Sequence, residues 1–275
     1  MAMATPDPGP ALGRCLQELH LPAMRAQYAA VARQAAAEAW AYPSYLLELA
    51  EREVQQRRHN RVERLLRASK LPLEKNWQAL DVKRLPAKAV QQLRGLLGGE
   101  FVDRRENVLV FGPPGAGKTH CLCALGQELV RAGRRVLLTT CSLLVQELLA
   151  AKRDLTLKGA LKRLGQWEAL LIDDLGYVQQ SREEMEVLFT LLAERYERAS
   201  VLVTSNLPFS KWEQIFKDPM TTAAAIDRLV HHSVIIELNV PSYRAEAAKK
   251  ARQGRGTSAP PEPPGPGGSQ GRAAG

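Results

Sequence analysis

The feature that most constrains this chain is the glycine-rich stretch Gly-Pro-Pro-Gly-Ala-Gly-Lys-Thr at residues 112–119. It follows the apolar run 107–111 and opens a helical pattern at Lys118, which is the strand–loop–helix context of a phosphate-binding loop. The glycines let successive backbone N–H groups turn toward phosphate oxygens, and the helix start adds positive potential. The sequence therefore predicts a nucleoside triphosphate site.

Each residue of the loop has an expected part in that site. The Lys118 ammonium is expected to reach the β- and γ-phosphates, and the Thr119 hydroxyl to ligate Mg²⁺. The predicted nucleotide-binding residues are Gly112, Pro113, Pro114, Gly115, Ala116, Gly117, Lys118, Thr119 and His120.

A pair of carboxylates supports this prediction. The apolar run 169–172 ends in Asp173 and Asp174, and a run that is apolar throughout is typical of a parallel strand buried on both faces. Ligands of open α/β sheets bind beyond the carboxyl ends of such strands. We expect Asp173 to position Mg²⁺, and Asp174 to orient or deprotonate the water that attacks the γ-phosphate. The alternative is that the two acids only form a turn.

A third apolar run, at 200–205, ends at Asn206. If this strand lies between the other two, the amide of Asn206 could bind the attacking water or the γ-phosphate. The residues alone support this role and a simple turn before Pro208 about equally, because asparagine is common in turns.

Composition points to a polyanionic partner. The chain has 275 residues, a hydrophobic fraction of 45% and a formal net charge of +9, which is typical of proteins that bind nucleic acid. No run of eighteen apolar residues is present, and the first ten residues lack the apolar core of a signal peptide. Four cysteines without a C-x-x-C pair are expected to be small apolar residues of a protein in the reducing cytoplasm.

The chain divides into four predicted parts. Residues 1–10 form a flexible leader, 11–98 a small all-α domain for DNA or partner binding, 99–248 the nucleotide-binding domain, and 249–275 a disordered glycine- and proline-rich tail. In the third part, strands are expected at 107–111, 135–140, 169–173, 200–205 and 234–238. Helices are expected at 118–132, 142–152, 156–165, 182–198, 209–217 and 221–231. This alternation predicts a parallel sheet wrapped by helices.

Two basic stretches are candidates for contact with DNA phosphates. The first is a stripe at helical spacing, formed by Arg57, Arg61 and Arg64 with Arg58 beside it. The second lies between the two nucleotide motifs and comprises Lys152, Arg153, Lys158, Lys162 and Arg163. Either stretch could instead be an ordinary solvated helix face.

Several short blocks in order make the chain resemble a known family. They include Leu-Pro-Ala-Met at 21–24, Gly-Lys-Thr-His at 117–120, Asp-Asp-Leu-Gly-Tyr at 173–177, Leu-Ala-Glu-Arg-Tyr at 192–196, Thr-Ser-Asn-Leu at 204–207, Ile-Asp-Arg-Leu at 226–229 and Pro-Ser-Tyr-Arg at 241–244. Across residues 12–248 the chain resembles the IstB-like transposition helper ATPases. These form a branch of the AAA+ superfamily near the DnaC helicase loaders and DnaA initiators.

The resemblance implies a specific fold and further site residues. It implies an AAA+ P-loop NTPase with a five-stranded parallel sheet, in which the strand before Asn206 lies between the phosphate-loop strand and the Asp173 strand. Asn206 would then sense the γ-phosphate. Arg228 would be an arginine finger offered to the nucleotide of a neighbouring subunit, and Arg244 a second sensor. Asp174 stands where most AAA+ proteins have glutamate, which implies slow, DNA-dependent hydrolysis.

The function implied is that of a cytoplasmic ATPase with ATP and Mg²⁺ as its cofactors. It would assemble as an ATP-dependent oligomer on double-stranded target DNA and assist a separate transposase. The nearest alternative is a DnaC-like replicative helicase loader with the same core. A small-molecule P-loop kinase and a DNA-binding switch that never hydrolyses ATP are alternatives of other classes.

Overall fold

The computed structural model describes residues 8–176, 181–216 and 218–243. Within them, a parallel sheet of five strands has the order β2-β3-β4-β1-β5. The strands are β1 (Asn107–Phe111), β2 (Val136–Thr140), β3 (Ala169–Leu175), β4 (Ser200–Ser205) and β5 (Ser233–Glu237). The strand before Asn206, β4, therefore lies between the phosphate-loop strand β1 and the acid strand β3, as the resemblance implied.

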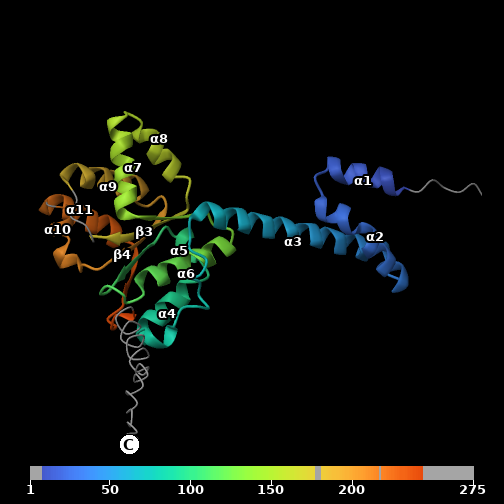
Figure 1. The fold of residues 1–275 in the computed structure, drawn as a ribbon, viewed down its shortest axis with the longest axis horizontal. Helices are drawn as coiled ribbons and strands as arrows, with labels where there is room; N and C mark the ends of the chain where they lie inside the picture. The colour runs from blue at the N-terminus through green and yellow to red at the C-terminus, as the bar shows by residue number, and fades with distance from the viewer. Residues whose placement is uncertain (1–7, 177–180, 217, 244–275) are drawn as a thin grey trace, which may run out of the picture.

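Helices cover both faces of this sheet (Figure 1). One face packs against α4 (Ala87–Leu96) and α6 (Lys118–Arg131). The other packs against α7 (Cys141–Arg153), α8 (Leu157–Leu164), α9 (Arg182–Arg195), α10 (Glu213–Phe216) and α11 (Pro219–Val230). Neighbouring strand residues point to opposite faces, so Val108 and Val110 join the first core and Leu109 the second. This arrangement confirms the predicted α/β class.

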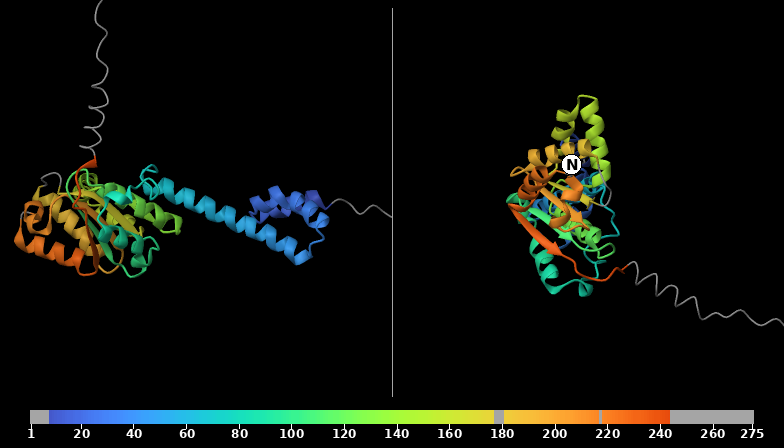
Figure 2. Two further views of the ribbon diagram at one scale, coloured as in Figure 1. Left: turned by 90° about the horizontal axis from the view of Figure 1, so that it is seen from below. Right: turned by 90° about the vertical axis from the view of Figure 1, so that its left-hand side faces the viewer.

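Three helices precede this domain, and the third packs against it near its C-terminal end, through Val62, Leu65 and Leu66. The helices are α1 (Gly9–Glu18), α2 (Pro22–Ala37) and α3 (Tyr42–Ser69). Helix α3 projects from the domain, and α1 and α2 pack beside its far end (Figures 1 and 2). Buried Glu53 of α3 ties this group together, because its carboxylate accepts the backbone N–H groups of Ala23 and Met24 at the start of α2, at 2.8 and 3.1 Å.

The core of the nucleotide-binding domain begins earlier in the chain than residue 99. Helix α3 ends at Ser69 with Lys70 as its C-cap, and the segment 71–86, which contains a short 3₁₀ turn at Val82–Arg84, leads into α4. Leu71, Leu85 and Leu93 are buried in one cluster with Leu122 of α6. The first core thus includes contacts from Val62 onward, well before residue 98, where the domain boundary is predicted. The short helix α5 (Glu100–Asp103) connects α4 to β1.

Some element boundaries differ from the predicted ones. Helix α1 begins inside the predicted leader, with proline in its first turn, where a missing N–H costs nothing. Helix α9 ends at Arg195 rather than at residue 198, because Tyr196 is extended and Glu197 has a left-handed φ of 56°. The helix expected near 209–217 is a 3₁₀ turn, Phe209–Lys211, followed by α10. Among the described helices, none combines the length and apolar character needed to cross a membrane.

Candidate nucleotide-binding site

The glycine-rich loop joins β1 to α6 and takes the backbone course that its glycines predict. Gly115 and Gly117 have φ values of 81° and 94°, in the left-handed region where a side chain would be strained. Gly117 is also the N-cap residue of α6, so the N-terminus of that helix faces the loop. The buried ammonium of Lys118 donates to the carbonyl oxygens of Gly112 and Pro113, at 2.9 and 3.1 Å. The lysine charge is therefore held directly against the loop.

Thr119 and Asp173 meet at the carboxyl end of the sheet. The Thr119 hydroxyl donates to Oδ1 of Asp173 at 3.1 Å, and the Thr204 hydroxyl makes a short hydrogen bond to the same oxygen. Asp173 is only 7% exposed, so these hydroxyls replace water around a buried carboxylate. Hydroxyl and carboxylate oxygens are the donors that Mg²⁺ prefers, so the donor set fits that ion.

An irregularity in β3 changes the direction of the Asp174 side chain. The pairing of β3 with β4 shifts register between Ile172 and Leu175, and Asp174 has a φ of 60°. Its backbone N–H donates to the Thr204 hydroxyl at 2.9 Å, which stabilises this bulge. Neighbouring residues of a regular strand would point to opposite faces, whereas a bulge re-aims one side chain. Asp174 is thus exposed at the rim of the cavity and Asp173 stays buried.

Sequence reasoning did not single out Thr204, although its hydroxyl joins both acids. It lies in the apolar run of β4, opposite Val110 of β1. A polar residue near the end of a buried strand, two positions before Asn206, was the available signal.

Asn206 follows β4 and lines the same cavity as Asp174. Its Oδ1 is buried and has no hydrogen-bond partner among the described residues. A buried amide oxygen without a partner is costly, and a water molecule or ligand group that donates to it would remove the cost. This position suits an acceptor for a water next to the γ-phosphate.

These residues surround a cavity of about 620 Å³, which is within the range of sites for nucleotide-sized ligands. Its floor is the loop from Pro114 to His120, and Asp174 and Asn206 stand at one side. The segment 75–85 and the segment 240–243, which follows β5, supply the other walls. The structure thus brings the predicted loop, Asp174 and Asn206 to one place.

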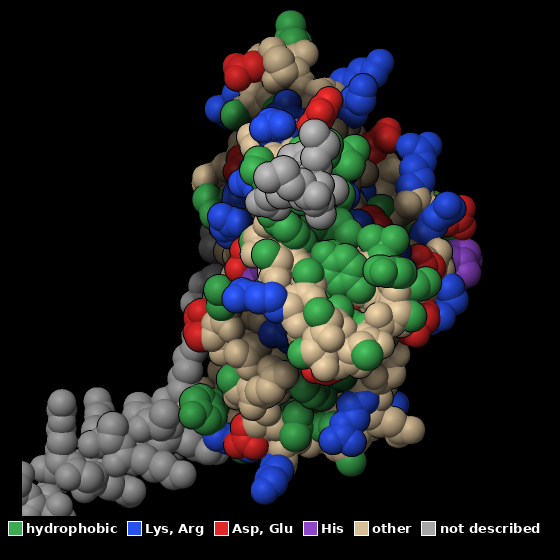
Figure 3. Space-filling model, turned by 90° about the vertical axis from the view of Figure 1, so that its right-hand side faces the viewer, with side chains coloured by type: hydrophobic (Ala, Val, Ile, Leu, Met, Phe, Trp, Pro, Cys, Tyr) green, Lys and Arg blue, Asp and Glu red, His purple; other side chains and the backbone are tan. Residues whose placement is uncertain are grey.

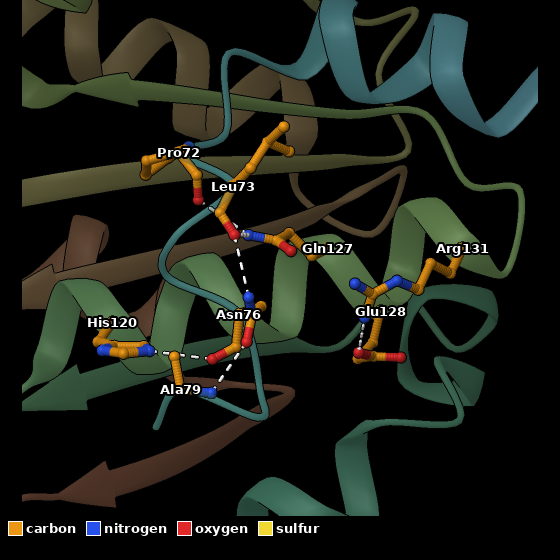
Figure 4. Close-up of polar contacts among 8 residues, drawn as sticks. All are labelled: Pro72, Leu73, Asn76, Ala79, His120, Gln127, Glu128 and Arg131. Atoms are coloured by element: carbon orange, nitrogen blue, oxygen red, sulfur yellow. Dashed lines mark hydrogen bonds and ion pairs between the residues drawn. The ribbon is translucent and has the colours of Figure 1, made fainter. Parts of the chain in front are cut away.

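The wall formed by residues 75–85 is fastened to α6 (Figure 4). Nε2 of His120 lies 3.0 Å from the Asn76 carbonyl oxygen, which can only accept, so Nε2 carries the proton. Gln127, about two turns further along α6, donates to the Pro72 carbonyl at 2.8 Å. His120, a predicted nucleotide-binding residue, therefore both lines the cavity and positions the segment that leads from α3 to it.

The sequence matches the family model of the IstB-like ATP binding protein over residues 14–251. The chain belongs to this family. An insertion sequence ATP-binding protein of Sinorhizobium fredii is 40% identical over 249 residues, which are 90% of this chain and 84% of the relative. The IS21 ATP-binding protein of Pseudomonas aeruginosa is 37% identical over 218 residues, 79% of this chain and 82% of the relative. This IstB-like chain is accordingly an ATP-binding protein.

Solved structures share the fold. DnaA from Aquifex aeolicus, bound to the ATP analogue AMPPCP, superposes with a TM-score of 0.53 at 17% identity, covering 68% of this chain and 57% of that one. DnaI gives a TM-score of 0.51 at 22% identity, covering 62% of this chain and 95% of that one. These likenesses show that the IstB-like protein shares its fold with DnaA and DnaI.

Arg228 of the IstB-like chain lies away from its own cavity. It is on α11, where Nη1 donates to the Ala224 carbonyl at 3.0 Å and the guanidinium stacks 4.6 Å from the ring centre of Phe189 on α9. Buried Asn107, at the start of β1, donates to the carbonyls of Arg228 and Leu229 at 3.3 and 3.1 Å. Asn107 therefore holds the end of α11 in position, a role that the sequence did not suggest. Arg244 lies outside the described residues.

The two basic stretches differ in how many of their side chains make hydrogen bonds or ion pairs within the chain. Arg57 donates to the Glu53 carboxylate at 3.1 Å and to the His20 carbonyl at 2.8 Å, and Arg61 donates to the Gly133 carbonyl at 3.2 Å. On α7, Lys152 is paired with Glu186 at 2.9 Å. The exposed basic residues of the second stretch without an acidic partner among the described residues are Arg153, Lys158, Lys162 and Arg163.

Proposed function

We propose that this protein hydrolyses ATP with Mg²⁺, assembles on double-stranded target DNA in its ATP-bound form, and assists a separate transposase. The observation that carries the proposal is the meeting of Lys118, Asp174 and Asn206 at one cavity next to the Thr119–Asp173 pair. The names of the relatives, which are ATP-binding proteins of insertion sequences, support the transposition role.

Each residue of the site has a separate role in the proposed hydrolysis. Lys118 and the loop N–H groups bind the phosphates. Thr119 and Asp173 would hold Mg²⁺, which neutralises charge on the β- and γ-phosphates. Asp174, exposed beside the cavity, takes a proton from the attacking water, and Asn206 orients that water through its buried Oδ1.

The Asp174→Asn variant tests the hydrolytic half of the proposal. It keeps the shape of the side chain and removes the base, so we expect ATP to bind normally while turnover falls by about 10²-fold or more. ATP titration and phosphate release measure the two effects, and the variant should also stay on DNA longer than the wild type. Glu183→Gln, an exposed acid at the start of α9, is the matched control. Normal turnover in Asp174→Asn would mean that another group activates the attacking water.

For DNA contact we favour the basic face of α8, defined here as Lys158, Lys162 and Arg163. These side chains are exposed on one short helix whose apolar residues Leu157 and Leu161 pack on the second core. Helices α7 and α8 together rise above the sheet (Figure 1). The stripe at Arg57–Arg64 is the secondary candidate, because two of its guanidinium groups are engaged within the chain.

Replacing the three residues of this face with alanine should weaken DNA binding and flatten its salt dependence. Each lost phosphate contact lowers the log–log slope by about 0.9, so the full effect is about 2.7. Binding at a series of salt concentrations measures the slope. A control variant removes three exposed charges elsewhere on the chain, at Lys83, Lys88 and Arg94. Equal slopes in the two variants would place the DNA surface elsewhere.

We propose that the N-terminal helices contribute a surface for self-assembly. Large apolar side chains are exposed there, at Leu19, Tyr42, Leu46 and Leu47. Figure 3 shows hydrophobic side chains gathered on this end of the molecule. Such a patch is typical of a protein interface.

The helicase-loader alternative has the same core, so the identity of the partner decides between the two functions. Co-purification with a transposase supports the proposal, and co-purification with a replicative helicase supports the alternative.

A further inference from the structure

We propose that the ring of Tyr243, held in place by Arg84, is the surface on which the nucleoside half of ATP binds. This inference rests on the proposed function, because it concerns the same cavity. It adds the residues that distinguish a nucleotide from a bare polyphosphate.

The sheet order indicates which end of the cavity receives the nucleoside. Asp174 and Asn206 follow β3 and β4, on one side of β1, and they mark the end at which the γ-phosphate reacts. The segment 240–243 follows β5, on the opposite side of β1. Since the phosphates run along the loop that follows β1, the ribose and base extend toward the β5 side.

The backbone fixes Tyr243 relative to the phosphate loop. Its N–H donates to the Gly115 carbonyl at 3.0 Å, and Leu238, just after β5, donates to the Phe111 carbonyl at 2.7 Å. Ser242 lies so close to Gly115 that a side chain at this glycine would collide with it. The chain after β5 therefore lies directly on the loop, and the position of Tyr243 is set by the element that binds the phosphates.

Arg84 reaches the same ring from the opposite wall. Its guanidinium carbon lies 5.0 Å from the centre of the Tyr243 ring, a cation–π contact that joins the two walls of the cavity. Tyr243 is nevertheless 58% exposed as a residue. An exposed aromatic ring held by backbone and cation contacts at the rim of a ligand cavity is suited to stack on a base.

The remaining wall residues suit a base rather than another phosphate. Leu80, Leu85, Val240 and Pro241 line this part of the cavity and provide apolar surface. The exposed carboxylate of Asp81 lies on the same wall, where it can accept hydrogen bonds from ribose hydroxyls or a base amino group but would repel phosphate. The chemistry of the cavity therefore changes from cationic at Lys118 to apolar and acidic at this end.

Two probes separate nucleoside binding from phosphate binding. We would titrate the wild type, Tyr243→Ala and Tyr243→Phe with ATP and, separately, with inorganic tripolyphosphate, both with Mg²⁺. Loss of the ring should weaken ATP binding about tenfold, because stacking on a base is lost, and leave tripolyphosphate binding within about twofold. Tyr243→Phe keeps the ring and should bind both like the wild type. Arg84→Ala should reproduce the alanine pattern to a smaller extent.

The outcomes distinguish this inference from the proposed function. If Tyr243→Ala binds ATP like the wild type, or weakens both probes equally, the ring does not recognise the nucleoside and the inference is overturned. A wild type that binds neither probe would instead contradict the proposed function. Lys118→Ala serves as the reciprocal control, since it should lose both probes.

Discussion

Lys118→Ala should reduce ATP binding and turnover to background while the protein stays folded. The Lys118 ammonium is the loop's side-chain cation, held over the loop by the Gly112 and Pro113 carbonyls and buried where we propose that the phosphates bind. Without it, the charge of the phosphates is balanced only by backbone N–H groups and Mg²⁺. Phosphate release and ATP titration measure the loss, and circular dichroism checks the fold.

The control for this variant is Lys75→Ala, which removes a lysine from the wall of the same cavity. A smaller effect is expected there, because Lys75 stands outside the loop. Wild-type turnover in Lys118→Ala would mean that the cavity around the loop is not the hydrolytic site.

Arg228→Ala should bind ATP and hydrolyse it about 10³-fold more slowly. Arg228 is not among the described residues that line its own cavity, and it stacks on Phe189 at the side of the domain. From this place it can act as a finger for the nucleotide of a neighbouring subunit, where it stabilises the charge on the transferring phosphoryl group. Turnover by the wild type should therefore rise faster than linearly with protein concentration and with DNA that nucleates assembly.

Mixing two inactive variants tests whether the finger acts between subunits. Arg228→Ala keeps its loop and Lys118→Ala keeps its finger, so a mixed interface restores one complete site and some activity. Arg198→Ala, which removes an exposed arginine paired with Glu194 at 3.1 Å, is the matched control and should remain active. No rescue on mixing, with specific activity independent of concentration, would show that Arg228 does not act in trans.

The conformation of the glycine-rich loop could be predicted from sequence because its residues are contiguous. The loop at 112–119 has a fixed spacing, and its glycines at positive φ and its helix N-cap follow from local backbone requirements. The alternation of apolar strands and amphipathic helices likewise predicted the parallel sheet. These patterns depend on residues that are close in the sequence.

Other parts depended on contacts between distant segments. Residues alone left Asn206 undecided, and only the position of β4 between β3 and β1 brought it to the cavity. The bulge at Asp174 is stabilised by the Thr204 hydroxyl of the neighbouring strand.

The sequence pattern also did not predict the cavity wall that contains Arg84 and Tyr243. Tyr243 meets Arg84, 159 residues earlier in the chain, because the segments before β1 and after β5 both pass the phosphate loop. The sequence by itself determined which elements form and where the glycine-rich loop lies between them, since local spacing and periodicity control both. The tertiary structure decided which side chains complete the site, because strand order and register place residues that no local pattern relates.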